Sequence, residues 1–141
     1  MTIEEKEQAI IDEFSLFEDW MDKYSHLIDQ AKSLPNIDES YKTDEHLVKG
    51  CQSQVWLNAE LNGGLVHYTA DSDAAISKGI MALLIRVLSN ETPEAILRAE
   101  LSFLDTIGLK EHLSSNRANG LSAMLKLMKA YALGFQIKSK Q

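Results

Sequence analysis

The clearest structural signal in the chain is residues 55–70, VWLNAELNGGLVHYTA. Apolar and polar residues alternate from Val55 to Leu61, which is the period-two pattern of a strand with one buried face. Asn62-Gly63 is the strongest short hairpin signal, and Leu65 to Ala70 then returns as a second strand. Because two strands alone are marginally stable, we expect residues 46–48 to add a third strand to a small antiparallel sheet.

Helical patterns precede this hairpin. Thr2 followed by Glu5 is a capping box, which predicts a helix from there to about Phe14. A second helical pattern ends near Leu34-Pro35, because the helical conformation is disfavoured for the residue before a proline. The apolar face of this second helix carries Trp20, Tyr24, Leu27, Ile28 and Ala31.

Further helices follow the hairpin. Asp71-Ser72-Asp73 is rich in N-cap residues and precedes an apolar helix over about residues 74–88. Thr92-Pro93 starts another helix, and a short helix over residues 102–107 stops at Gly108. The apolar positions of the last helix include Leu121, Met124, Leu125, Met128 and Leu133.

Length and composition fit one globular domain. The 141 residues are 45% hydrophobic and 25% charged, the balance of a chain that can bury a core. We therefore expect one α+β domain over residues 1–141, with a small antiparallel sheet of about three strands packed against N- and C-terminal helices.

The charge argues against two kinds of partner. Lys plus Arg number 14 and Asp plus Glu number 21, so the net charge is −7. Nucleic acids and anionic membranes both attract basic surfaces, so we expect neither as a partner. The apolar runs are too short to span a bilayer, and the acidic N-terminus lacks the apolar core of a secretory signal. A cytoplasmic location is the resulting expectation.

The one cysteine, Cys51, follows Gly50 in a polar segment just ahead of the first predicted strand. One thiol cannot form an internal disulfide or a four-cysteine metal site, so any chemistry of Cys51 involves a second molecule. A lone cysteine is most often a small buried apolar residue, and this inert role stays open from the residues alone. The histidines are scattered, at His26, His46, His67 and His112.

The segment from Gly50 to Trp56, GCQSQVW, resembles the signature of the SufE family of sulfur-acceptor proteins. Other blocks occur in the family's order over about residues 17–132. These blocks are Trp20, Tyr24, Leu27-Ile28 and Leu34-Pro35, then Ala70 to Ile76 with Lys78-Gly79, then His112 to Ser114 with Arg117, Asn119-Gly120-Leu121 and Ala123-Met124. Four ordered blocks with compatible gaps identify the chain as a member of this family.

The resemblance implies a function beside a PLP-dependent, SufS-like cysteine desulfurase. That enzyme removes sulfur from cysteine and holds it as a persulfide. Cys51 would accept the sulfur and pass it to an iron–sulfur cluster assembly scaffold, and its uptake would stimulate the desulfurase. The chain would then be a carrier rather than an enzyme, without a cofactor or metal of its own, because the PLP belongs to the desulfurase.

The resemblance also places Arg117 near Cys51, and we expect Arg117 and Asp73 to position the loop that holds the thiol. Gly50 allows backbone angles closed to other residues, so it is the expected hinge of that loop. The polar residues expected to let the loop enter the partner's active site are Gln52, Ser53 and Gln54. An ordinary thiol, with a pKa of about 8.5, is only a few per cent ionised at neutral pH, so proximity in the docked complex is expected to supply much of the activation.

Three other functions stay open at this point. An iron–sulfur scaffold needs several thiolate or imidazole ligands around one site, which one cysteine does not supply. A thiol hydrolase needs a histidine base beside Cys51, and the spacing of the sequence offers none. An interaction module would leave Cys51 inert.

Overall fold

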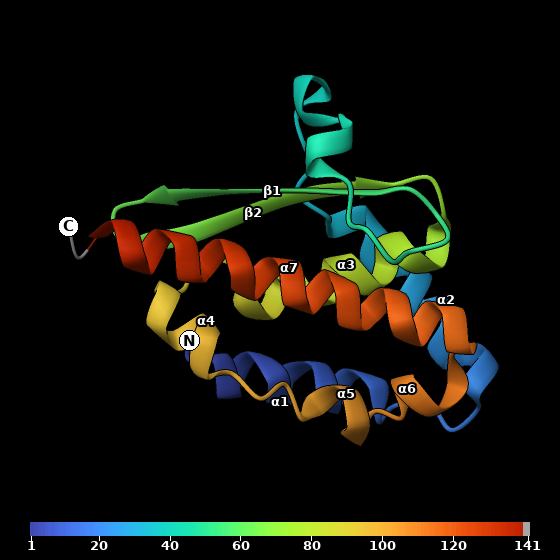
Figure 1. Cartoon of the computed structure of the whole chain (residues 1–141). Helices are drawn as coiled ribbons and strands as arrows, with labels where there is room; N and C mark the ends of the chain where they lie inside the picture. The colour runs from blue at the N-terminus through green and yellow to red at the C-terminus, as the bar shows by residue number, and fades with distance from the viewer. Residues whose placement is uncertain (140–141) are drawn as a thin grey trace.

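The structure is a computed structural model that describes residues 1–139, and it consists of a two-stranded sheet with helices on one of its faces (Figure 1). In chain order the elements are α1 (Ile3–Phe14), α2 (Trp20–Asp29), η1 (Gln30–Ser33), η2 (Glu39–Tyr41), η3 (Asp44–His46), β1 (Val55–Asn62), β2 (Leu65–Ser72), α3 (Ala75–Leu88), α4 (Pro93–Arg98), α5 (Phe103–Thr106), α6 (Leu109–His112) and α7 (Ser115–Ser139), where η marks a 3₁₀ helix. The α+β fold class expected from the sequence is confirmed.

The hairpin forms as the sequence predicts. β1 and β2 pair antiparallel in a continuous register from Val55 opposite Ser72 to Asn62 opposite Leu65. The two turn residues, Gly63 and Gly64, have φ values of 61° and 81°, the left-handed conformation that a tight two-residue hairpin turn requires. The alternation then places every second side chain toward the helices. The buried strand residues are Val55, Leu57, Val66, Tyr68, Ala70 and Ser72.

The expected third strand is wrong, because residues 46–48 contribute only one isolated bridge, between Leu47 and Trp56. His46 ends the 3₁₀ helix η3, so the chain becomes extended only at Leu47. Gly50 then turns it away with φ of 101°. The extended stretch between these two features is too short to build a ladder.

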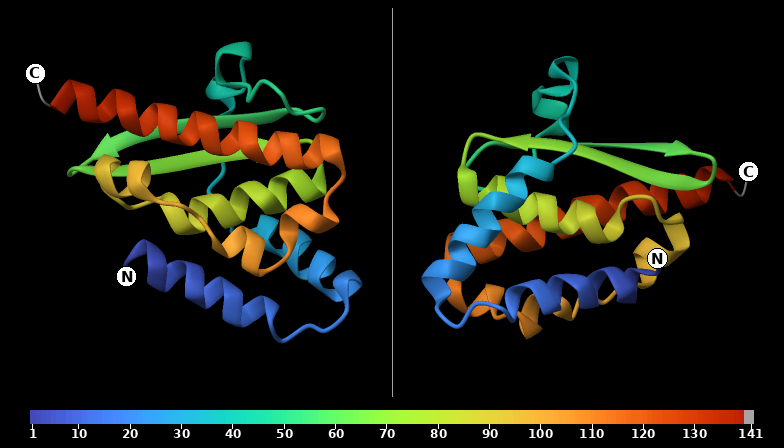
Figure 2. Two further views of the ribbon diagram at one scale, coloured as in Figure 1. Left: turned by 60° about the horizontal axis from the view of Figure 1, so that its bottom comes forward. Right: turned by 180° about the vertical axis from the view of Figure 1, so that it is seen from behind.

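The core lies between the sheet and the helices below it. α3 and α7 run beneath the sheet, and α1, α5 and α6 lie on the far side of them (Figures 1 and 2). Tyr68 of β2 is buried on the face toward the helices. Its hydroxyl donates to the Met128 carbonyl of α7 at 2.7 Å, which connects the sheet to that helix. The buried residues of α7 are Gly120, Leu121, Met124, Met128 and Ala132. Leu133, expected in the apolar stripe, is instead 47% exposed, because it lies one position past that face.

The N-terminal helices are fixed to this core by polar contacts. The capping box is present, with Thr2 Oγ1 accepting from the Glu5 amide at 3.1 Å and the Thr2 amide donating to the Glu5 carboxylate at 3.0 Å. Arg86 of α3 forms an ion pair with Glu13 of α1, and His26 Nε2 of α2 lies 3.0 Å from the same carboxylate. One carboxylate therefore joins three helices.

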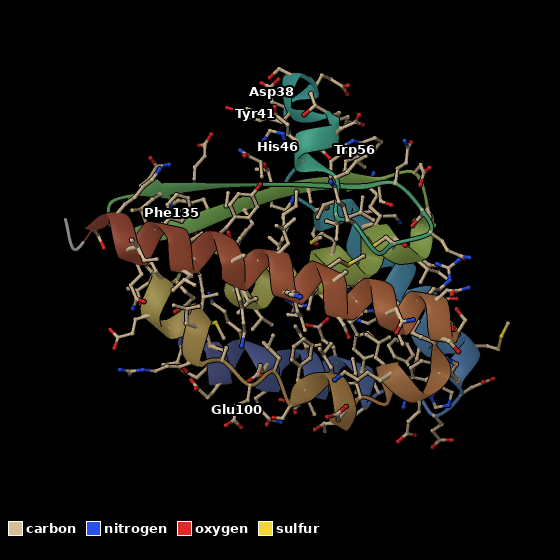
Figure 3. All side chains as sticks on the ribbon, viewed as in Figure 1. Asp38, Tyr41, His46, Trp56, Glu100 and Phe135 are labelled. Atoms are coloured by element: carbon tan, nitrogen blue, oxygen red, sulfur yellow. The ribbon has the colours of Figure 1, made fainter. Side chains whose placement is uncertain are left out.

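Residues 38–46 form a projection on the face of the sheet that the helices leave uncovered (Figure 2). The 3₁₀ helices η2 and η3 make up much of this projection. Tyr41 and His46 lie on this projection near Trp56 of β1 (Figure 3), with the Tyr41 and His46 rings 5.0 Å apart. Lys42 Nζ lies 5.7 Å from the centroid of the Trp56 ring, so the projection contacts the strand that follows Cys51.

Candidate functional site

Cys51 lies on the loop between the bridge residue Leu47 and β1, and its side chain is half-buried. Gly50 precedes it with φ of 101°, a conformation that side-chain-bearing residues rarely adopt. A Cβ atom at Gly50 would lie 3.3 Å from the Cβ of Ala123 on α7. The backbone angle and the close approach together explain why this position is a glycine.

The Cys51 thiol packs directly on helix α7. Its Sγ donates to the Gly120 carbonyl at 3.6 Å, a weak hydrogen bond of the protonated thiol. A Cβ atom at Gly120 would lie 3.2 Å from the same Sγ, which is tighter than nine in ten real contacts of that kind. A glycine at position 120 therefore lets the thiol reach the helix backbone without crowding.

Two cavities meet at the Cys51 loop. The inner cavity has a volume of about 210 Å³ and lies between the loop, α3 and the first turns of α7. Its lining residues are Cys51, Gln52, Ser53, Ser77, Ile80, Asn116, Arg117, Gly120 and Met124. The outer cavity has a volume of about 420 Å³ and extends from the loop toward the projection, with Asp44, Leu47 and Lys49 among its walls. Cys51, Gln52 and Ser53 line both cavities, so the loop is the partition between them.

Polar contacts hold the loop to the end of β2 and the start of α3. The Gln54 amide donates to Asp73 Oδ1 at 3.0 Å. The Gln54 carbonyl accepts from the Ser72 hydroxyl at 2.8 Å and from the Asp73 amide at 3.2 Å. Ser53 Oγ lies 2.8 Å from Ser77 Oγ, and Ser77 is only 6% exposed. The C-terminal half of the loop is thus anchored, while Gly50, Cys51 and Gln52 make fewer contacts.

Burial raises the pKa of the Cys51 thiol above its ordinary value. The neighbouring cations, Lys49 in the outer cavity and Arg117 in the inner one, do not outweigh this desolvation. In the structure as it stands, Cys51 is therefore a protonated and weakly nucleophilic thiol.

The structure brings together the residues that the sequence analysis singled out. Arg117 lines the same cavity as Cys51, although 66 positions (117 − 51) separate them in the chain. Asp73 contacts the loop through both its carboxylate and its amide. Gln52 and Gln54 are exposed, and Ser53 is half-buried against Ser77.

Two features of this site were missed in the sequence. Ser77 is a buried polar residue of a largely apolar helix, and Gly120 is a glycine well inside a helical pattern. A lone glycine in a helix usually has a packing reason, so Gly120 carried a signal that could have been used. The prediction of an N-cap within Asp71-Ser72-Asp73 is wrong, because Ala74 is the N-cap residue of α3 and has no side-chain cap. The Asp73 carboxylate binds the Cys51 loop instead.

Within residues 1–139, no three His, Cys, Asp or Glu side chains come together as a metal site would require. His46 lies 3.1 Å from Thr43 Oγ1, and His112 lies 2.9 Å from the Gly108 carbonyl. No described helix combines the length and the apolar character needed to cross a bilayer.

The fold and the site define a small α+β protein that holds a single thiol on an anchored loop. The family model for SufE, the Fe-S metabolism associated domain, matches residues 8–132. An uncharacterised SufE-like protein of Rhizobium meliloti is 39% identical over 130 residues, which covers 89% of this chain and 93% of that protein. The chain belongs to the SufE family.

Two further comparisons concern a longer plant relative and a solved structure. SufE-like protein 1 of Arabidopsis thaliana, whose name places it in chloroplasts and mitochondria, is 40% identical over 140 residues; the match covers 96% of this chain but only 37% of that longer protein. A solution structure of a hypothetical protein from Thermus thermophilus superposes with a TM-score of 0.76 at 24% identity, covering 92% of this chain and 94% of the other. That likeness shows a shared fold.

Proposed function

We propose that this protein accepts sulfur as a persulfide on Cys51 from a SufS-like cysteine desulfurase, and that it hands the sulfur to an iron–sulfur cluster assembly scaffold. The observation that carries the proposal is the placement of Cys51, a lone thiol on an anchored loop between two cavities, in a chain of the SufE family. The Fe-S metabolism of that family supplies the context. We further propose that the protein acts in the cytoplasm.

The transfer step balances without an outside oxidant or reductant. The Cys51 thiolate attacks the outer sulfur of the desulfurase persulfide, and a new sulfur–sulfur bond forms at Cys51. The sulfur–sulfur bond of the donor breaks, and the donor cysteine leaves as a thiolate that takes up the proton lost by Cys51. Removing the persulfide frees the desulfurase for its next turnover, which is how the carrier would also stimulate that enzyme. The PLP that releases sulfur from cysteine stays on the desulfurase.

The loop has to move before this reaction, because Sγ rests against α7 and burial keeps the thiol protonated. Two side-chain contacts oppose the movement. They are the thiol bond to the Gly120 carbonyl at 3.6 Å and the hydroxyl pair of Ser53 and Ser77 at 2.8 Å. Gly50 can absorb the change in backbone angles. Moving outward would return Cys51 to water or to the partner's active site, which removes the desolvation that raises its pKa.

We assign two supporting roles in this mechanism. Asp73 holds the Gln54 end of the loop, so that Cys51 and Gln52 swing while the base of the loop stays in place. Arg117 lines the inner cavity and supplies positive charge there, which would favour a thiolate or persulfide anion over the neutral thiol. Proximity in the docked complex provides the rest of the activation.

The proposal is tested by the turnover of a cysteine desulfurase, measured as sulfide or alanine release with increasing amounts of the carrier. We expect the wild-type chain to stimulate turnover and Cys51→Ser to fail, while Cys51→Ser still competes with wild type for the enzyme because the fold is intact. Stimulation by Cys51→Ser equal to that by wild type would remove the thiol from the mechanism.

A matched pair of arginine variants tests the role of Arg117. Arg117→Ala should slow sulfur uptake more than it lowers the melting temperature. Arg98→Ala removes the same charge from α4, where Arg98 pairs with Glu94 on the surface, and should leave uptake unchanged. Equal effects of the two variants would show that net charge, rather than the position of Arg117, matters.

A further inference from the structure

We propose that Tyr24, on helix α2, is a positioning residue for the cavity wall that α7 presents to Cys51. The inference rests on the proposed function and adds to it a residue that touches neither the thiol nor its cavity. The Tyr24 hydroxyl donates to the backbone carbonyl of His112 at 2.7 Å, and 88 positions of the chain separate the two residues. Among the hydrogen bonds within residues 1–139, this is the one that joins α2 to the segment leading into α7.

The contact fixes the chain directly ahead of α7. His112 is the last residue of α6, and α7 begins at Ser115. Leu113, between them, is buried, so the carbonyl of His112 is held on one side by Tyr24 and on the other by the core. The Trp20 ring stacks on the His112 ring at 3.9 Å and meets the Tyr24 ring edge-on at 5.4 Å, which restricts the movement of the segment.

The fixed segment also determines where the first two turns of α7 lie. Ser114 Oγ accepts from the Arg117 amide at 3.3 Å, and the Ser114 carbonyl accepts from the Ala118 amide at 2.9 Å, so the helix starts at once from the fixed segment. Arg117 and Gly120 then line the inner cavity, with the Gly120 carbonyl on the Cys51 thiol.

Helix α2 also packs against α3, which forms the opposite wall of the cavity. A Cβ atom at Gly79 of α3 would lie 2.2 Å from the Leu27 carbonyl oxygen of α2, so the two helix backbones are in direct contact. Ser77 and Ile80 on the same α3 turn line the cavity. Through Leu27 and Tyr24, α2 therefore sets the distance between the α3 wall and the α7 wall.

Tyr24→Phe tests this role, because it removes the hydroxyl and keeps the ring. We expect the alkylation rate of Cys51 by iodoacetamide in the isolated protein to rise about fivefold, since one net hydrogen bond favours the closed arrangement by about that factor. With a desulfurase and cysteine, we expect the maximal rate of sulfur uptake to fall about fivefold at an unchanged KM for the carrier, because Arg117 is displaced and the docking surface is not. Tyr41→Phe removes a hydroxyl from the projection, outside this contact, and should match wild type in both assays.

Two outcomes overturn the inference. In the first, Tyr24→Phe behaves like Tyr41→Phe in both assays. In the second, Tyr24→Phe lowers the melting temperature but changes neither the alkylation rate nor the rate of sulfur uptake. Should Tyr24→Phe fail to fold, Ser114→Ala decides, because it loosens the same helix start and should raise alkylation in the same way; an unchanged rate there refutes the inference. A wild-type chain that takes up no sulfur refutes the proposed function instead, and alkylation still tests the position of α7.

Discussion

Replacing Gly120 by alanine probes the contact on which the resting state of Cys51 depends. The new Cβ atom would lie 3.2 Å from Cys51 Sγ and 3.9 Å from the Cα and Cβ atoms of Cys51. The last two distances are ordinary contacts, so the sulfur atom alone is crowded. Either Sγ moves out of its position or the loop shifts away from α7.

The size of the effect follows from two opposing terms. Alanine in place of glycine inside a helix stabilises it by about 1 kcal/mol. Overpacking a close contact costs about 1–3 kcal/mol where the neighbour cannot yield. In a Cys51→Ala background the crowded atom is absent, so only the helix term remains. We therefore predict a coupling free energy of about 1–3 kcal/mol between the two substitutions.

The assay is urea unfolding of wild type, Gly120→Ala, Cys51→Ala and the double variant, with the alkylation rate of Cys51 measured in the first two. Gly134→Ala is the matched control, because Gly134 lies in the same helix and a Cβ atom there meets nothing within 4 Å. It should show the helix gain in either background and no change in alkylation. Faster alkylation of Gly120→Ala is expected, since the crowding favours the open loop. Additive free energies together with an unchanged alkylation rate would show that the thiol does not pack on α7 in solution.

Three further predictions follow from single contacts. Asp73→Ala frees the Gln54 amide, so alkylation of Cys51 should rise about fivefold with global stability lowered by about 1 kcal/mol or less; a larger global loss with unchanged alkylation would contradict the anchoring role. Tyr68→Phe removes the hydroxyl that donates to the Met128 carbonyl, which keeps its partner within α7, and should lower the free energy of unfolding by about 1 kcal/mol in urea titrations; a neutral substitution would mean that water replaces the hydroxyl. Burial raises the pKa of the folded Cys51 thiol, so its contribution to stability is complete below the ordinary thiol pKa of about 8.5 and is lost as the pH rises through the higher folded value. The stability difference between wild type and Cys51→Ser should accordingly shrink from about pH 8 upward, and a constant difference would refute the burial of the thiol.

Local signals in the sequence were sufficient for the elements whose structure depends on neighbours in the chain. Asn62-Gly63 predicted the hairpin, although the structure places the two left-handed turn residues one position later, at Gly63 and Gly64. Thr2 and Glu5 specified the start of α1 through contacts three residues apart. The prediction of a third strand was wrong for a physical reason that the alternation of apolar and polar residues does not reveal. A 3₁₀ turn and the left-handed Gly50 leave only Leu47 and Val48 extended beside β1.

The site depends on contacts between distant segments, which spacing cannot reveal. Asp73 illustrates the limit: the local pattern of Asp71-Ser72-Asp73 predicts only a helix cap, and the expectation that Asp73 positions the loop, which its contact with Gln54 fits, did not come from spacing. In the sequence, Gly120 is only a glycine that weakens a helix, and its role becomes visible once the structure shows Cys51 packed against it. The approach of Arg117 to the Cys51 loop came from the family resemblance, and the structure supplies the cavity that both residues line.

The most direct test of sulfur transfer to Cys51 is the intact mass of the protein after incubation with a cysteine desulfurase and cysteine, without reductant. Wild type should gain the mass of one sulfur atom, located at Cys51 by peptide mapping and removed by a thiol reductant. Cys51→Ser should gain nothing. A wild-type protein of unchanged mass, or a sulfur atom added equally to Cys51→Ser, would contradict the proposal that this thiol carries sulfur.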